Sequence, residues 1–289
     1  MTIKSILCIF SGSQNELNAL NTALVLGKAH GTQVRVLHVS SEPSAYVGLY
    51  GEGVFVSGEI IAAIEKENKE RLNKAKQYVT SFAAEHHVPL DQPDAPTHHA
   101  SARFVHLVGM VDATIAREGR LCDLVVLGGV DDKATHDYIT PALFDTGRPV
   151  LLMPAAHDDM PRDWNDKTVA VAWDGSLQAA RALHNAMPLI ANTEKLIVLT
   201  AQESGKAFDL EAESGVMEYL LAHGIHTQVI AVATGQRTVP EALLARAKDL
   251  HADLLVMGAY GHSMFREMIL GGVTEHMLNK ADIPLLLSH

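Results

Sequence analysis

Apolar residues along the chain fall into short continuous runs separated by longer amphipathic segments, a pattern typical of alternating strands and helices. Five strands are predicted in the second half, at 168–173, 196–201, 226–232, 254–257 and 285–287. Helices are predicted between them, at 177–190, 208–223, 239–250 and 272–279. Several strand runs are apolar throughout, which indicates burial on both faces and therefore an α/β fold with a mostly parallel sheet flanked by helices.

The first half of the chain repeats this design. Three of its motifs return in the same order: ILCIFSGS at 6–13 as VAVAWDGS at 169–176, DLVVLG at 123–128 as DLLVMG at 253–258, and RPVLLM at 148–153 as IPLLLS at 283–288. Such a repeat predicts two tandem Rossmann-like domains, each with a five-stranded sheet. We expect them at residues 1–154 and 167–289, joined by a polar linker at 155–166.

Composition narrows the range of functions. The formal net charge of −11 would repel nucleic acid phosphates, so no nucleic acid partner is expected. No apolar run approaches the length of a membrane span, and the first run is too short for a signal peptide, so we expect a cytoplasmic protein without a membrane partner. The 16 histidines include no set with carboxylates or cysteines at metal-ligand spacing, so no metal site is expected.

Four glycines follow the fourth predicted strand of the second half. Gly258 ends that strand, Gly261 follows closely, and Gly271 and Gly272 stand where the last helix begins. Glycines let the backbone approach a ligand closely, and the free N–H groups of a helix N-terminus favour an anion. The spacing therefore predicts a phosphate-binding loop. The alternative is that these glycines serve only as turn and helix-start residues.

Asp174 is the second candidate, because it follows the first strand of the second half at the same edge of the sheet. Its carboxylate could accept hydrogen bonds from an adenine amino group or a ribose hydroxyl. It could equally help Ser176 to cap the next helix. The residues alone leave both roles open.

Together these motifs resemble the universal stress protein family in its tandem two-domain form. The three glycines of the family pattern Gly-x2-Gly-x9-Gly-Ser/Thr are matched from Gly258 to Gly271, and the Val-x-x-Asp-Gly-Ser start is matched at 171–176. The resemblance implies that the second domain binds an adenine nucleotide, ATP with or without Mg²⁺. By position it implies contacts from the first strand, the second strand and the glycine loop: Ala172, Trp173, Asp174, Ala201, Met257, Gly258, Gly261, His262, Gly271, Gly272, Val273 and Thr274.

Gly272 is a departure from the family pattern, which has serine or threonine at this place. The hydroxyl donor to phosphate is lost, although the backbone N–H remains. One neutral hydrogen bond contributes about 0.5–1.5 kcal/mol, so the affinity is expected to fall about three- to tenfold without vanishing.

The first half departs further. Ser11 replaces the aspartate, the loop at 128–131 lacks the second glycine, and Asp131 brings a negative charge. Gly128 precedes Pro149 by 21 residues whereas Gly258 precedes Pro284 by 26, so this loop is five residues shorter. We expect the first domain to serve as a structural partner that does not hold ATP in the family manner. Another ligand beneath the segment 46–55 is the alternative.

These expectations describe a stress-response protein that acts as a nucleotide-dependent regulator and not as an enzyme, because the sequence contains no P-loop lysine motif and no catalytic base is evident. The alternatives are a slow ATP hydrolase, a scaffold without nucleotide, or a binder of another small ligand.

The predicted edge strands at 150–153 and 285–287 could pair between halves or between chains. We therefore expect either a homodimer of tandem chains or a pseudo-dimeric monomer.

Overall fold

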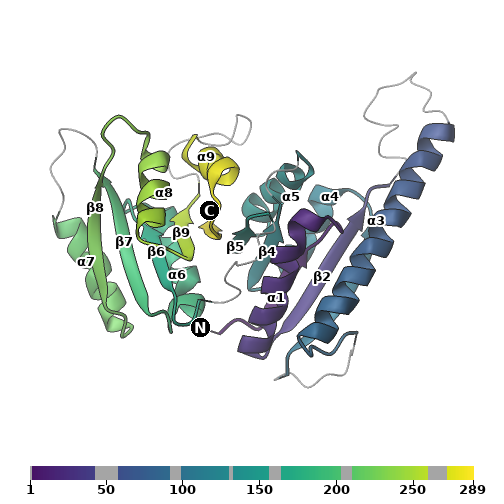
Figure 1. The fold of residues 1–289 in the computed structure, drawn as a ribbon, viewed down its shortest axis with the longest axis horizontal. Coiled ribbons are helices and arrows are strands. Elements are labelled where there is room, and N and C mark those ends of the chain that lie inside the picture. Colours follow the sequence, from purple (N-terminus) through teal and green to yellow (C-terminus); the bar gives the residue numbers. More distant parts are fainter. Residues whose placement is uncertain are drawn as a thin grey trace. The chain divides into compact units, whose positions relative to one another are not determined.

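The computed structural model of the 289-residue chain describes residues 2–42, 58–91, 99–129, 133–155, 164–202, 210–259 and 272–289. The chain divides into two compact units. The N-terminal unit holds residues 2–148 and 153–158, and the C-terminal unit holds residues 149–152 and 159–289. Each unit is described by itself below, with the labels of Figure 1.

The N-terminal unit is built on parallel strands in the order β3-β2-β1-β4. These strands are β1 (Ser5–Ile9), β2 (Gln33–Ser40), β3 (Ser101–Val108) and β4 (Leu124–Gly128). The helical elements are the short 3-10 helix η1 (Gln14–Glu16), α1 (Leu17–His30), α3 (Gly58–Glu85), α4 (Val111–Gly119) and α5 (Lys133–Phe144). Helices α1 and α3 contact each other, as do α4 and α5. Right-handed crossovers place these two pairs on opposite faces of the sheet (Figure 1).

The C-terminal unit repeats this plan with strands in the order β10-β9-β6-β7-β8, all parallel. The strands are β6 (Thr168–Ala172), β7 (Lys195–Gln202), β8 (Thr227–Ala233), β9 (Leu254–Gly258) and β10 (Leu285–Ser288). The helices are α6 (Leu177–Ile190), α7 (Leu210–Ala222), α8 (Val239–Asp249) and α9 (Gly272–Lys280).

Strand β5 (Val150–Met153) adds an antiparallel strand to the C-terminal unit. Val150, Leu151 and Leu152 pair with Leu287, Leu286 and Leu285 of β10. All four residues of β5 and all four of β10 are buried. Of the two pairings that the sequence left open for these edge strands, the structure contains the one within a single chain.

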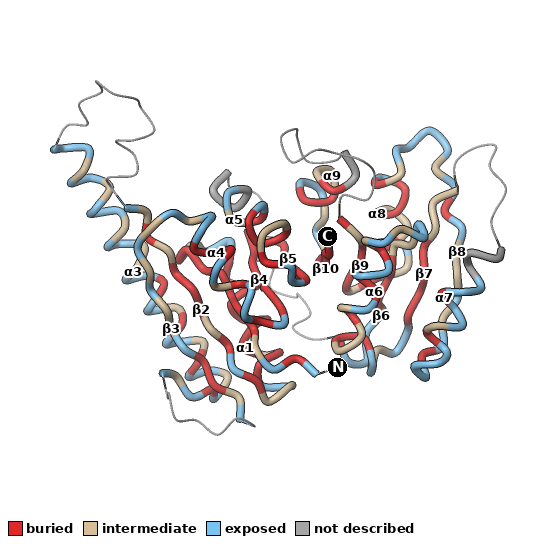
Figure 2. The backbone as a smooth tube through the Cα atoms, turned by 180° about the vertical axis from the view of Figure 1, so that it is seen from behind, coloured by how far each residue is buried: buried red, intermediate tan, exposed pale blue. Residues whose placement is uncertain are grey.

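The expected fold class is confirmed: both units are α/β, with mostly parallel sheets flanked by helices. Figure 2 shows the reason for the apolar strand runs, because buried residues follow the central strands of each unit. Two helices of the C-terminal unit, α6 and α8, begin where side chains supply caps. Ser176 Oγ accepts from Ala179 N at 3.1 Å before α6, and Glu241 accepts from Thr238 N at 2.8 Å at the start of α8.

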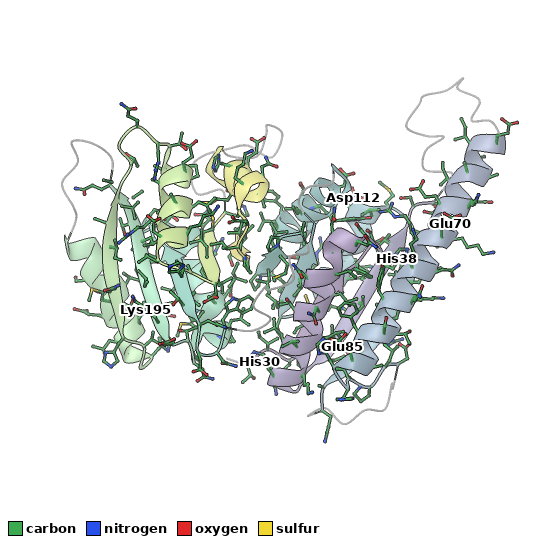
Figure 3. All side chains as sticks on the ribbon, in the orientation of Figure 1. His30, His38, Glu70, Glu85, Asp112 and Lys195 are labelled. Carbon is green, nitrogen blue, oxygen red and sulfur yellow. The ribbon has the colours of Figure 1, made fainter. Side chains whose placement is uncertain are left out.

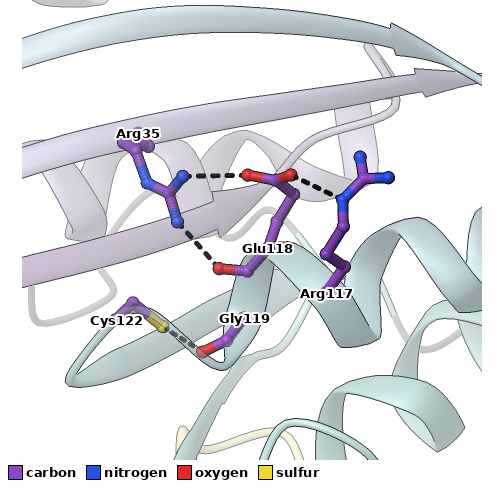
Figure 4. A network of polar contacts seen from close by, with 5 residues as sticks. All are labelled: Arg35, Arg117, Glu118, Gly119 and Cys122. Carbon is purple, nitrogen blue, oxygen red and sulfur yellow. Dashed lines mark hydrogen bonds and ion pairs between the residues drawn. The ribbon is translucent and has the colours of Figure 1, made fainter.

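A polar network fixes the end of α4 on the sheet of the N-terminal unit (Figure 4). Arg35 on β2 donates to Glu118 Oε2 at 2.9 Å and to the Glu118 carbonyl oxygen at 2.7 Å. The Cys122 thiol donates to the Gly119 carbonyl at 3.1 Å, and burial raises the pKa of Cys122 to about 11. Both cysteines, Cys8 and Cys122, are free and buried.

In the segment expected to link the domains, the described residues 155 and 164–166 include the well-packed Trp164. Trp164 is 1% exposed, and its Nε1 donates to the Asp253 carbonyl at 3.1 Å within the C-terminal unit. The predicted domain boundaries stay a prediction. Among the residues that the structure describes, no helix is long and apolar enough to cross a membrane.

Candidate functional site

The carboxyl ends of β6 and β9 lie side by side in the C-terminal unit. Ala172, the last residue of β6, pairs with Met257 of β9. In the sheet, β7 lies on one side of β6 and β9 lies on the other side, next to β10. The direction in which successive strands are added to the sheet therefore reverses between β6 and β9. Ligands of open α/β sheets bind at such a topological switch point. The structure brings Asp174 and Gly258 to its two sides.

Asp174 holds the turn between β6 and α6. Its Oδ1 accepts from Ser176 N at 2.9 Å, and Gly175 between them has a φ of +72°. The capping role that the sequence allowed for Asp174 is thus present. The residue is exposed, so its carboxylate remains accessible while one oxygen shapes the turn.

Gly258 has a packing role at the end of β9. A Cβ at this position would lie 2.6 Å from Ala179 N and 2.6 Å from the carbonyl carbon of Gln178. Only glycine therefore lets the first turn of α6 pack against the strand end. This contact brings a helix N-terminus, which favours negative charge, to the carboxyl edge of the sheet.

The remaining predicted contacts lie in several places. Ala201 lies on β7, where it pairs with Val232 of β8. Gly272 and Val273 begin α9, and Thr274 in its first turn is buried with 2% exposure. Gly261, His262 and Gly271 lie outside the described residues.

Sequence reasoning missed Thr200, which lies on β7 next to Ala201. The side-chain oxygen of Thr200 is buried without a hydrogen-bond partner, and so is the indole nitrogen of Trp173. The available signal was a hydroxyl residue that ends the otherwise apolar run at 196–199.

The corresponding edge of the N-terminal unit contains a buried carboxylate. Ser11 stands at the position that Asp174 has in the repeat, and it donates its N–H to Glu16 Oε2 at 2.7 Å and its hydroxyl to Oε1 at 2.8 Å. Burial raises the pKa of Glu16 to about 7, although the hydrogen bonds from Ser11 act in the opposite direction. The side chain is 4% exposed, so this carboxylate is sealed inside the protein.

Protein atoms fill the space around this carboxylate. A Cβ on Gly129 would lie 3.3 Å from Glu16 Cγ. A Cβ on Gly12, whose φ is +90°, would lie 2.7 Å from the carbonyl oxygen of Arg71 on α3. Helix α3 and Glu16 therefore occupy the edge of the sheet that the C-terminal unit leaves to Asp174. Asp131 lies outside the described residues.

Two histidines of the same unit lie on strands that contact helix α3: His38 on β2, labelled in Figure 3, and His106 on β3. His38 is buried on β2, and its Nδ1 donates to the Phe10 carbonyl at 3.0 Å. Burial lowers the pKa of His38 to about 4, so this ring is neutral at physiological pH. His106 lies 3.0 Å from the hydroxyl of Ser40 through its Nε2. Within the described ranges, no group of three or more His, Cys, Asp or Glu side chains is placed to hold a metal ion.

Comparison with known proteins identifies the family. The model of the universal stress protein family matches residues 2–133 and 166–289, so the chain belongs to this family as a tandem of two such domains. Universal stress protein Slr1230 from Synechocystis sp. is 24% identical, covering 98% of this chain and 99% of that protein.

Solved structures of the same family share the fold. A universal stress protein from Archaeoglobus fulgidus superposes with a TM-score of 0.70 at 21% identity, covering 99% of this chain and 96% of that one. A putative universal stress protein from Pseudomonas aeruginosa gives a TM-score of 0.61 at 15% identity, covering 99% and 93%.

Proposed function

We propose that the C-terminal unit binds one adenine nucleotide, ATP with or without Mg²⁺, and that the protein acts as a nucleotide-dependent regulator in a stress response. The observation that carries this proposal is the placement of Asp174 and Gly258 on either side of the switch point between β6 and β9. Ligand sites of parallel α/β sheets form at such points.

The two sides of this edge suit different parts of a nucleotide. Asp174 uses one carboxylate oxygen for Ser176 N, which leaves the other as an acceptor for a ribose hydroxyl or an adenine amino group. The start of α6 packs against Gly258, and α9 begins at Gly272, so two helix N-termini supply N–H donors for phosphate. These features support an anionic ligand with a polar ring system.

The N-terminal unit has a structural role in this proposal. Its equivalent edge contains the Glu16 carboxylate, which would repel a phosphate whenever it is charged. Helix α3 packs against Gly12 at the same edge. One nucleotide per chain is therefore expected, bound by the C-terminal unit.

Calorimetric titration of ATP into the full chain, with and without Mg²⁺, tests the proposal. Saturable binding is expected for the wild type, and it should be lost or strongly weakened in Asp174→Ala and in Gly261→Val. Glu194→Ala removes an exposed carboxylate from the same unit, before the amino end of β7, and should bind as the wild type does. Absence of binding at millimolar ATP would refute the proposal. Steady phosphate release with turnover would instead make the protein an ATP hydrolase.

A further inference from the structure

Two neighbouring side chains of the C-terminal unit contain polar atoms that are buried without a partner. Trp173 Nε1 and Thr200 Oγ1 are two of the three such atoms in the described part of the chain; the third is Thr32 Oγ1. Buried donors and acceptors are nearly always hydrogen-bonded, because an unmade bond costs free energy in the folded state. Two such atoms on neighbouring residues therefore indicate that a hydrogen-bonding partner from outside the chain binds there.

The register places both residues at the candidate site. Ala172, the last residue of β6, pairs with Leu199 of β7, and Trp173 N donates to the Leu199 carbonyl at 2.9 Å. Trp173, directly after the end of β6, therefore stands next to Thr200 of β7. Side chains alternate between the faces of a sheet, and neighbours in register share a face. Both therefore lie on one face at the carboxyl end, and Trp173 directly precedes Asp174.

The repeat supplies an internal comparison. In the N-terminal unit, Phe10 N donates to the Leu37 carbonyl at 2.9 Å, so Phe10 and His38 are the counterparts of Trp173 and Thr200. Phe10 has no side-chain polar atom, and His38 Nδ1 donates to the Phe10 carbonyl at 3.0 Å. The two unpartnered atoms, Trp173 Nε1 and Thr200 Oγ1, thus occur in the unit in which Asp174 is exposed. The equivalent positions of the N-terminal unit, where Glu16 is buried, do not contain such a pair.

We propose that Trp173 and Thr200 read the edge of the nucleotide base, an inference that rests on the proposed nucleotide site. An indole N–H can only donate, so its partner must be an acceptor such as a purine ring nitrogen. A threonine hydroxyl can donate or accept, so it can bind the exocyclic group beside that nitrogen. The pair would thereby select a purine that carries an acceptor at this edge.

Conservative variants test this inference in the full chain. Trp173→Phe keeps an aromatic ring but removes the N–H, and Thr200→Val keeps the shape but removes the hydroxyl. Each is expected to weaken ATP binding about three- to tenfold, the range of one hydrogen bond. Because each also removes an unpartnered atom, neither should lower the thermal stability of the ligand-free protein. A merely structural role would predict the opposite: reduced stability with unchanged affinity.

Trp164→Phe is the matched control, because it removes the other tryptophan N–H of the chain, which donates to the Asp253 carbonyl. It should lower stability and leave ATP affinity unchanged. In this variant Trp173 is the only tryptophan, and its fluorescence should change when ATP is added.

Analogues of ATP that lack one purine ring nitrogen, 1-deaza-ATP and 7-deaza-ATP, identify the recognised atom. One of them should bind the wild type more weakly than ATP does, and Trp173→Phe should abolish that difference. Equal ATP affinity of wild type, Trp173→Phe and Thr200→Val would overturn the inference while leaving the nucleotide site intact. Failure of the wild type to bind ATP would instead refute the proposed function itself.

Discussion

Ser11 donates both its backbone N–H and its hydroxyl to the carboxylate of Glu16, at 2.7 and 2.8 Å. In the repeat, Ser11 corresponds to Asp174, so each unit has a carboxylate beside the end of its first strand. The two carboxylates differ in access, because Asp174 is exposed whereas Glu16 is buried. At this place the N-terminal unit therefore has a buried carboxylate, whereas the C-terminal unit has an exposed one.

Glu16 should make the stability of the protein depend on pH. Its pKa is raised from 4.5 to about 7 in the folded protein, so the folded state binds more protons than the unfolded chain between these values. The free energy of unfolding therefore falls as pH rises from 4.5 to 7. Glu16→Gln lacks this titration, so urea denaturation should show its stability relative to wild type increasing by about 3 kcal/mol between pH 4.5 and pH 8.

The exposed Glu194 provides the control for this measurement. Glu194→Gln removes an exposed carboxylate in the same way and controls for the loss of one formal charge. A Glu16→Gln curve parallel to that of the wild type would show that Glu16 is ionised normally.

His38 should have the opposite effect on the acid side. Burial lowers its pKa from 6.5 to about 4, so the unfolded chain takes up a proton first as the pH falls. The free energy of unfolding therefore declines from pH 6.5 towards pH 4. In the wild type, the titration of Glu16 offsets this fall in the free energy of unfolding, so the fall should be visible only in Glu16→Gln. Adding His38→Gln to Glu16→Gln should remove it. If the free energy of unfolding of the double variant still fell between pH 6.5 and pH 4, other groups would be its cause.

Gly258→Ala should destabilise the C-terminal unit by about 3 kcal/mol, because the new methyl group would overlap the backbone of Gln178 and Ala179 at 2.6 Å. Gly175→Ala is the matched comparison. Its φ is +72° but the space around it is open, so only the backbone strain of about 1–2 kcal/mol should appear. Equal losses in chemical denaturation would contradict the close packing of α6 on β9.

Arg35→Lys should lower stability by about 1 kcal/mol even though the charge is kept. Arg35 uses two guanidinium nitrogens for the carboxylate and the carbonyl of Glu118, and lysine cannot reproduce this planar arrangement. Because both side chains are only about 20% exposed, solvent screening is limited. Denaturation of Arg35→Lys and Glu118→Gln, alone and together, gives their coupling energy; additive losses would show that the pair is energetically unimportant.

Periodicity and caps allowed much of the fold to be predicted. The helix predicted at 177–190 is α6 (Leu177–Ile190), and the one predicted at 239–250 is α8 (Val239–Asp249). These predictions succeeded because local patterns determine helices. The antiparallel pairing of β5 with β10 remained one of two alternatives, because strands far apart in sequence carry no local signal for their partner.

The candidate site was predictable in position but not in detail. The sequence placed Asp174 and Gly258 at one sheet edge, since both follow buried strands. It gave no indication that Gly258 is required by the first turn of α6, because that contact depends on packing between elements. Glu16 likewise resembles an ordinary acidic residue near a helix start, and only the fold shows that it reaches Ser11.

The number of ATP molecules bound per chain tests the central claim most directly. Equilibrium dialysis of the full chain against labelled ATP should saturate at one molecule per chain, and Asp174→Ala should reduce this number towards zero while Ser11→Ala leaves it unchanged. Two equivalent molecules per chain, or one molecule retained fully in Asp174→Ala, would contradict the account of a single site in the C-terminal unit.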